Sequence, residues 1–349
     1  SLYTDEIYSK ELYGEESSLL KLEKKYMNNC TYMILKRLSS MYNPEYYHKQ
    51  RMRMPIYRET TPRILSLFEE DDCFVYLPRG IKDKIKAVLS NTVLNLNSQI
   101  CTGNPIEVAF KGKLRDNQMD AVNVLLKYDM GVLKAVPGFG KTVIGIYIIS
   151  KLKVSTLIIV PSKQIQEQWL DRIQEFLEVP ETKLKKDRFV CKFNGSSKRM
   201  NGNIDIAIAA SLANIENLEG NLKDYGLVLV DECHHAASNT FTYCLRHIRA
   251  KYIYGLSATP KRKDGLDKIM HMFCGPIRYE TSKSQMQNTY TFQQILIPRI
   301  TTFSTLKEVS YAELCNELIN DSARNYLIIK DIMNELQESR KLIVLSERK

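Results

Sequence analysis

The sequence predicts an α/β fold, a doubly wound parallel sheet, in the middle of a chain of 349 residues. From residue 111 onward, short apolar runs alternate with longer amphipathic segments, which is typical of strands and helices in a parallel sheet. A glycine-containing loop follows one of these runs, and an acidic pair ends another. Hydrophobic residues make up 44% and charged residues 26% of the chain, as in ordinary globular proteins, which excludes a fibrous or disordered chain.

Five apolar runs are predicted to be buried strands, and two amphipathic segments between them have helical length and spacing. The strands are expected at residues 131–136, 156–160, 204–209, 227–230 and 252–256. The helices are expected at residues 142–152 and 163–177. Such βαβ units build a doubly wound domain, predicted here over residues 111–285.

Residues 1–110 are predicted to form a smaller α/β domain, because helical and strand-like pieces there are interrupted by several prolines. Residues 42–63 interleave tyrosines with lysines and arginines, a mixture that contacts phosphates and stacks on exposed bases. This accessory domain is therefore a candidate DNA-binding domain. A solvated basic face with half-buried tyrosines is the alternative interpretation.

Residues 286–349 are predicted to be a linker and the beginning of a further domain. Two helices are expected at residues 308–319 and 323–338, followed by a strand at residues 341–345. Because the chain ends at Lys349, we expect it to stop as another sheet begins.

The formal net charge is +10, and +8 of it falls within residues 111–280. A basic balance favours polyanionic partners, of which nucleic acid is the first candidate. The eight cysteines are scattered without a CxxC pair, which favours a reducing, intracellular compartment. No apolar run approaches the roughly 18 residues of a membrane span, so no membrane partner is expected. The sequence does not indicate an oligomeric state.

Residues 135–142 (AVPGFGKT) lie after a predicted strand and before a predicted helix, which is the setting of a phosphate-binding P-loop. The two glycines allow backbone N–H groups to turn toward phosphates, and the helix N-terminus adds its positive end. Lys141 is expected to reach the β and γ oxygens, and the Thr142 hydroxyl to ligate Mg²⁺. The general pattern begins with Gly where this chain has Ala135. The predicted nucleotide-binding residues here are Pro137, Gly138, Phe139, Gly140, Lys141 and Thr142.

Asp231 and Glu232 end an apolar run, at the edge of a parallel sheet where ligands bind. Asp231 is expected to hold Mg²⁺, and Glu232 to orient or deprotonate the water that attacks the γ-phosphate. An isolated acidic pair is more often part of a solvated loop, but here a P-loop precedes it. Lys141, Asp231 and Glu232 are therefore the predicted catalytic residues, with ATP and Mg²⁺ as cofactors. A P-loop metabolic kinase is the alternative enzyme class.

Residues 257–260 (SATP) also end a predicted strand. Small hydroxyl residues there could connect the acidic pair to a moving neighbour, although a plain turn would use the same residues. The P-loop, residues 231–234 (DECH) and this motif occur in the order found in superfamily 2. The combination closely resembles the superfamily 2 helicases and translocases.

This resemblance implies a RecA-like first motor lobe at residues 111–285 and only the start of a second RecA-like lobe after it. Within the first lobe, Gln118 would hydrogen-bond adenine with help from Arg115. The nucleic-acid contacts that the resemblance implies are Pro161, Ser162, Ser211 and Arg262. The residues implied to couple the two sites are His234, Ser257 and Thr259.

Within the superfamily, residues 114–118 (LRDNQ), 231–235 (DECHH) and 256–265 (LSATPKRKDG) look most like the xeroderma pigmentosum type B helicases. Their relatives in poxviruses and other large DNA viruses act in transcription and transcript release. The likeness thus implies an ATP-dependent 3′-to-5′ DNA helicase or translocase and a partner in the transcription machinery. The compartment would be the cytoplasm for a cytoplasmic virus and the nucleus otherwise.

Two alternatives for the substrate stay open. The DECH motif also occurs in innate-immune RNA sensors, so an RNA-stimulated ATPase is one of them. A translocase on double-stranded DNA that does not separate strands is the other. Residues 342–348 resemble the first motif of a second lobe, whereas the arginine-bearing last motif has no counterpart. We therefore expect a fragment of a helicase that hydrolyses ATP feebly by itself.

Overall fold

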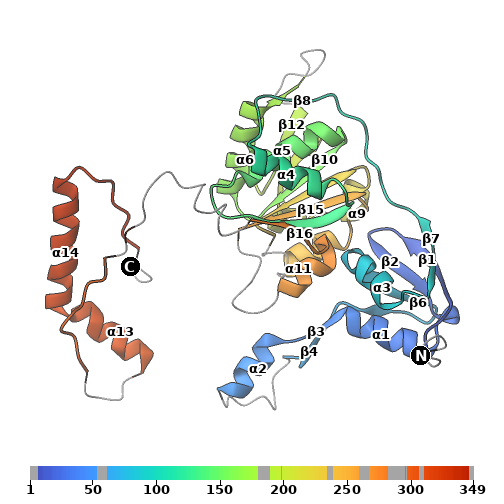
Figure 1. Cartoon of the computed structure of the whole chain (residues 1–349), viewed down its shortest axis with the longest axis horizontal. Helices are drawn as coiled ribbons and strands as arrows, with labels where there is room; N and C mark the ends of the chain where they lie inside the picture. The colour runs from blue at the N-terminus through green and yellow to red at the C-terminus, as the bar shows by residue number, and fades with distance from the viewer. Residues whose placement is uncertain are drawn as a thin grey trace. The chain divides into compact units, whose positions relative to one another are not determined.

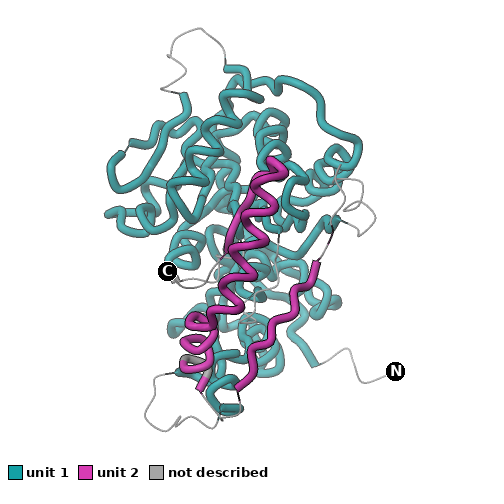
Figure 2. Tube along the Cα trace, turned by 90° about the vertical axis from the view of Figure 1, so that its left-hand side faces the viewer, with its two compact units in different colours: residues 1–289 teal, residues 290–349 magenta. Residues whose placement is uncertain are grey.

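The computed structural model describes residues 7–52, 61–179, 189–197, 199–233, 239–258, 267–281, 295, 297–305 and 310–345. The chain divides into two compact units, residues 1–289 and 290–349 (Figure 2). The larger unit contains a five-stranded and a seven-stranded sheet (Figure 1). None of the described helices is long and apolar enough to cross a membrane.

The seven-stranded sheet has the order β12-β13-β10-β14-β15-β9-β16, and each neighbouring pair is parallel. Its strands are β9 (Met130–Lys134), β10 (Thr156–Val160), β12 (Val190–Phe193), β13 (Ile204–Ile208), β14 (Leu227–Asp231), β15 (Tyr252–Ser257) and β16 (Ile277–Glu280). The five predicted strands are present with small shifts at their ends. The outermost strands, β12 and β16, were not predicted. The predicted doubly wound α/β fold is confirmed.

Helices cover both faces of this sheet, because parallel strands are apolar on both sides. Successive residues of β14 alternate between two core clusters, with Leu227 and Leu229 in one and Val228 and Val230 in the other. The first cluster includes residues of α4 (Asp116–Leu125), α5 (Lys141–Leu152) and α6 (Lys163–Phe176). The second includes residues of α8 (Ala209–Leu212), α9 (Leu218–Leu222), α10 (Asn239–Leu245) and α11 (Asp267–Cys274).

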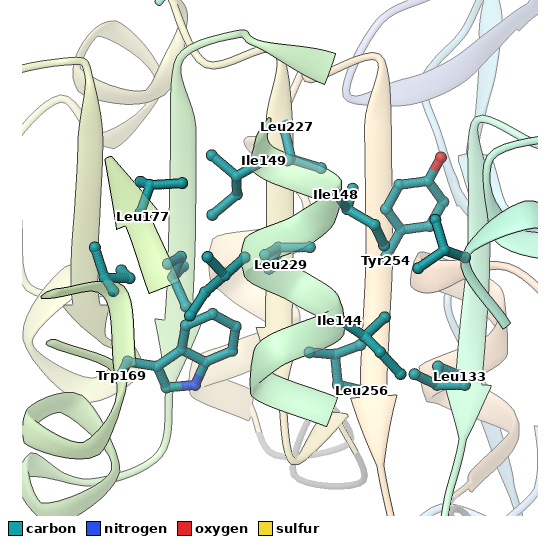
Figure 3. Close-up of a cluster of buried hydrophobic side chains, with 14 of the residues drawn as sticks. Leu133, Ile144, Ile148, Ile149, Trp169, Leu177, Leu227, Leu229, Tyr254 and Leu256 are labelled. Carbon is teal, nitrogen blue, oxygen red and sulfur yellow. The ribbon is translucent and has the colours of Figure 1, made fainter. Parts of the chain in front are cut away.

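Helix α5 lies against the centre of the sheet (Figure 3). Its Ile144, Ile148 and Ile149 are fully buried, and they pack in the same cluster as Leu229 and Leu256 of the strands. Burial of each such side chain contributes about 1.5–3 kcal/mol. A short antiparallel pair, β8 (Ala109–Phe110) with β11 (Leu177–Glu178), lies next to this face. Packing therefore fixes the helix that follows the P-loop.

The N-terminal part of the larger unit has a sheet of its own, with the order β5-β6-β2-β1-β7. Its strands are β1 (Glu11–Glu16), β2 (Leu19–Glu23), β5 (Glu69–Glu70), β6 (Phe74–Pro78) and β7 (Val93–Ser98). The same N-terminal part also contains η1 (Lys24–Tyr26), α1 (Asn29–Leu38), α2 (Pro44–Arg51), η2 (Arg79–Ile81) and α3 (Lys82–Val88). Two further strands, β3 (Ser40–Tyr42) and β4 (Ile64–Ser66), pair with each other in a separate sheet. A small N-terminal α/β region is therefore present, while the predicted domain boundaries remain predictions.

A buried arginine joins the N-terminal sheet to the seven-stranded one. The guanidinium of Arg79 is 3% exposed and donates to the carbonyl oxygens of Ser17 at 3.1 Å and Ala250 at 2.9 Å. Burial lowers its pKa to about 10. The adjacent Gly80 packs so closely that a Cβ atom there would lie 2.6 Å from the carbonyl oxygen of Met272. The two sheets consequently belong to one compact unit.

The smaller unit contains α13 (Tyr311–Asn320) and α14 (Ser322–Gln337), close to the two predicted helices. Ser310 caps α13 by accepting from the Glu313 N–H group, and Asp321 caps α14. The prediction of a strand at residues 341–345 is wrong for this structure, because these residues are described and form no strand. A strand needs a neighbour for its backbone hydrogen bonds, and the described residues of this unit include no other strand.

The close packing of Gly80 between the two sheets gives a first prediction. Gly80→Ala should lower the free energy of unfolding by about 1–3 kcal/mol, because the new methyl group meets backbone atoms that cannot move independently. Urea unfolding measures the change. The matched control is Gly195→Ala, whose Cβ would meet nothing within 4 Å and which should stay within about 0.5 kcal/mol of the parent. Equal unfolding midpoints for the two variants would contradict the tight joint.

Candidate nucleotide site and nucleic-acid edge

The predicted site residues follow strands that all end at the same edge of the sheet. Lys141 and its loop follow β9, Asp231 ends β14 and Ser257 ends β15. Pro161 follows β10, and Ser211 follows β13 within α8. Because these strands are parallel, their carboxyl ends meet at one edge, which is where open α/β sheets bind ligands. Residues scattered over the sequence are thus brought to a common surface.

The P-loop has the backbone that a phosphate requires. Gly138 and Gly140 have φ values of +78° and +91°, which only glycine adopts at low cost. A Cβ atom on Gly138 would meet nothing within 4 Å, so open space adjoins the loop. Gly140 is the N-cap of α5, whose unpaired N–H groups attract anions. Lys141 donates from Nζ to the Ala135 carbonyl oxygen at 3.2 Å, and Phe139 is fully buried as an anchor.

Arg115 and Gln118, at the start of α4, form hydrogen bonds that support the P-loop. The Gln118 side chain is 5% exposed and donates from Nε2 to the Phe139 carbonyl oxygen at 2.7 Å. The Arg115 guanidinium donates to the same oxygen at 2.6 Å. Gln118 Oε1 in turn accepts from the Arg115 backbone N–H at 3.0 Å. Both residues therefore contact the nucleotide loop, while their predicted contact with adenine remains a prediction.

Asp231 is a buried carboxylate with two hydrogen-bond donors. It is 6% exposed, and Oδ2 accepts from Trp169 Nε1 at 2.6 Å while Oδ1 accepts from the Glu232 N–H at 2.9 Å. Burial raises the pKa of Asp231, and the two donors oppose this rise because they favour the charged form. The Lys141 ammonium, at the same sheet edge, also opposes this rise in the pKa.

Glu232 lies just beyond the strand with φ of +46°, in the left-handed region that is uncommon for residues other than glycine. Its side chain is partly exposed. The strained backbone costs on the order of 1 kcal/mol and turns the chain sharply after Asp231. The two adjacent carboxylates therefore differ, since one is buried at the strand end and the other reaches toward solvent.

The donor set fits a Mg²⁺-bound nucleotide. Mg²⁺ typically takes one or two protein ligands and completes its octahedron with phosphate oxygens and water. Asp231 retains unshared lone pairs, and Thr142 lies partly exposed in the first turn of α5. Within the part of the chain that is described, no three His, Cys, Asp or Glu side chains form a protein-only metal cluster. The residues thus suit a metal that arrives with phosphate.

The residues predicted to contact nucleic acid lie at the same edge of the sheet, after the strands β10 and β13. Pro161 and Ser162 are partly exposed, and the Ser162 side chain caps α6 by accepting from the Ile165 N–H at 3.4 Å. Ser211 is partly exposed in α8. Ser257 is buried, and its carbonyl oxygen accepts from the Ala135 N–H at 3.0 Å, which connects β15 to the start of the P-loop.

Three predicted residues, His234, Thr259 and Arg262, lie outside the described residues. Two contacts were not predicted. The first is the hydrogen bond of Trp169 to Asp231, for which the only signal was a single tryptophan in an amphipathic helix. The second is Thr281, whose hydroxyl oxygen accepts from the Val136 N–H at 3.4 Å and which no sequence motif marked.

Comparisons with known proteins bear mainly on the domain of the seven-stranded sheet. Residues 111–262 match the family model described as the type III restriction enzyme, res subunit, and this stretch is less than half of the chain. Over this stretch the chain is similar to that family. "Putative helicase 161L" of Invertebrate iridescent virus 6 is 28% identical over 68% of this chain and 54% of its own length. "DNA 3'-5' translocase XPB2" of Sulfurisphaera tokodaii is 31% identical over 52% of this chain and 38% of its own length.

A solved structure agrees with the fold of the larger α/β domain. The UvsW helicase from Bacteriophage T4 superposes with a TM-score of 0.56 over 78% of this chain and 99% of that chain, at 16% identity. This similarity confirms the RecA-like α/β architecture. The present chain spans about half, or less, of the length of the curated relatives named above.

The support of the P-loop by α4 gives a second prediction. Gln118→Ala removes the donor to the Phe139 carbonyl and the acceptor of the Arg115 N–H, both within a buried region. We expect the free energy of unfolding to fall by about 1–3 kcal/mol, and nucleotide affinity to fall with it. Gln164→Ala, at an exposed position of α6, is the control and should change stability by less than about 0.5 kcal/mol. A Gln118→Ala protein as stable as this control would refute the supporting role.

Proposed function

We propose that this protein uses ATP hydrolysis to move along or unwind nucleic acid, with DNA as the favoured polymer. One observation carries the proposal. The P-loop follows β9, Asp231 ends β14 and Ser257 ends β15, and these three strands are neighbours in the sheet, whereas Pro161 and Ser211 follow the adjoining strands β10 and β13. A nucleotide half and a nucleic-acid half therefore share one sheet edge.

In the nucleotide half, Lys141 binds the β- and γ-phosphates as the loop N–H groups surround them. Thr142 and Asp231 would hold Mg²⁺, which when bound neutralises charge on the phosphate oxygens. Glu232, partly exposed beside Asp231, orients the attacking water and accepts its proton. Gln118 and Arg115, already at the P-loop, extend toward the base.

In the nucleic-acid half, Pro161, Ser162 and Ser211 contact the sugar-phosphate backbone, and Arg262 adds a positive charge. Contacts of this kind position a protein without reading sequence. The +8 charge of residues 111–280 supports binding to any polyanionic strand. His234, Ser257 and Thr259 are proposed to couple this half to the nucleotide half.

DNA is preferred over RNA on the strength of the relatives and the motif pattern. The relative in Sulfurisphaera tokodaii is named a DNA translocase, and residues 259–265 resemble the pattern of the DNA-translocating branch. An RNA-stimulated ATPase is the second candidate, because "Putative ATP-dependent RNA helicase L396" of Acanthamoeba polyphaga mimivirus is 31% identical over 49% of this chain. Translocation on duplex DNA without strand separation is a further alternative. A role in viral transcription and a reducing intracellular compartment belong to the main proposal.

The test is ATPase activity of the full natural protein with single-stranded DNA, duplex DNA or RNA of equal length and sequence. If single-stranded DNA stimulates the ATPase most strongly, the result supports a helicase. If duplex DNA stimulates it most strongly, the result supports a translocase on duplex DNA. Strongest stimulation by RNA would replace DNA with RNA. Turnover that no nucleic acid changes would overturn the proposal.

The catalytic assignment gives a third prediction. Lys141→Ala and Glu232→Gln should both abolish turnover, but only Lys141→Ala should lose ATP affinity. Removal of the ammonium deletes a charge-assisted contact to phosphate that contributes about 1.5–3 kcal/mol. The Gln variant keeps the pocket and should retain bound ATP.

Equilibrium binding of ATP and steady-state hydrolysis separate these effects. Lys151→Ala, at an exposed position farther along α5, and Glu175→Gln, exposed on α6, are the matched controls and should behave like the parent. If the two catalytic variants lose ATP affinity equally, the roles given to Lys141 and Glu232 are incorrect.

A further inference from the structure

We propose that Trp169 is a positioning residue that holds the Asp231 carboxylate for the metal-bound nucleotide and connects it to the nucleic-acid half of the edge. The inference rests on the proposed function of the site. It assigns a role to a side chain that no motif places at the nucleotide. Trp169 is also the one tryptophan in the chain, so tryptophan emission reports on the surroundings of this ring.

The hydrogen bond has the geometry of a strong, charge-assisted contact. Trp169 Nε1 donates to Asp231 Oδ2 at 2.6 Å, and both atoms are buried. The indole ring is fully buried beside the central strands (Figure 3). A buried indole N–H requires an acceptor, and a buried carboxylate requires donors, so each group satisfies the other. This bond fixes the orientation of the carboxylate plane.

Packing prevents the indole from moving independently. A Cβ atom at Gly145 of α5 would lie 2.7 Å from Cη2 of Trp169 and 3.2 Å from Cδ1 of Leu229. Because Gly145 has no side chain, α5 leaves room for the indole ring of Trp169. Since α5 begins at Lys141, the tryptophan contacts the phosphate-binding helix on one side and the metal-binding carboxylate on the other.

The same tryptophan belongs to the helix that starts at the nucleic-acid half. Helix α6 is capped by Ser162, in the loop proposed to contact the sugar-phosphate backbone. Within α6, the buried Gln166 amide donates to the carbonyl oxygens of Phe193 at 3.1 Å and Ile206 at 2.6 Å, on β12 and β13. The helix is thus attached to β13, the strand that leads to Ser211. We expect a shift of the loops around Ser162 and Ser211 to reach Asp231 through Trp169.

A purely structural tryptophan would fill the same space, so the test must separate the N–H group from the ring. Replacement of Trp169 by β-(3-benzothienyl)alanine exchanges the N–H for sulfur and keeps the shape. Calorimetric titration measures ADP affinity with Mg²⁺ and with EDTA. We expect the Mg²⁺-dependent gain in affinity to fall by about 10–100-fold, with affinity in EDTA unchanged. An unchanged Mg²⁺-dependent gain would overturn the inference.

Two substitutions with natural amino acids guard against a folding artefact. Trp169→Phe also removes the N–H and should reduce the same Mg²⁺-dependent gain. Ile173→Val, on the buried face of the same helix, removes packing but no hydrogen bond, so it should lower the unfolding midpoint and leave the Mg²⁺ dependence intact. Loss of the Mg²⁺ dependence in Ile173→Val as well would assign the effect to packing and refute the positioning role.

Intrinsic fluorescence of the parent protein provides a readout that needs no turnover. Addition of Mg²⁺ with ADP should change the emission of Trp169, and the change should be absent from Asp231→Asn. Nucleotide that binds with Mg²⁺ dependence but leaves the emission unaltered would refute the inference while preserving the proposed function. Absence of any nucleotide binding would overturn both.

Discussion

The parallel direction of all neighbouring strands in the seven-stranded sheet is the constraint on which the site depends. Because β10, β13, β14, β15 and β9 point the same way, the loops that follow them meet at one edge. Parallel strands also require apolar cover on both faces, and this is why the isoleucines of α5 and the helices α8 to α11 are as important to the site as its polar residues. The packing of α5 holds the P-loop at the start of the helix.

A buried carboxylate at the end of an apolar strand is costly unless donors surround it. Asp231 obtains one donor from the next peptide unit and one from Trp169, which lies 62 residues away in the sequence. These bonds offset part of the desolvation without closing the carboxylate to a metal. The arrangement pairs a buried carboxylate with Trp169, the largest fully buried side chain among the described residues.

The N-terminal sheet belongs to the same compact unit as the seven-stranded sheet and is not a loosely tethered module. Arg79 and Gly80 make contacts with Ala250 and Met272 that tolerate little displacement. Met272 of α11 even belongs to the hydrophobic core of the N-terminal sheet.

The sequence by itself determined the α/β class, the five central strands, the P-loop and the acidic pair, because each depends on local hydrophobic periodicity or on a contiguous motif. It did not reveal β12 and β16, which carry charged residues and depend on pairing with their neighbours. It also predicted a strand at residues 341–345, for which the described residues of the smaller unit offer no partner strand. Only the tertiary structure decided that Gln118 contacts the P-loop carbonyl and that Trp169 holds Asp231. Both are hydrogen bonds between residues far apart in the chain, and the parallel sheet and its packed helices must form before such groups can meet.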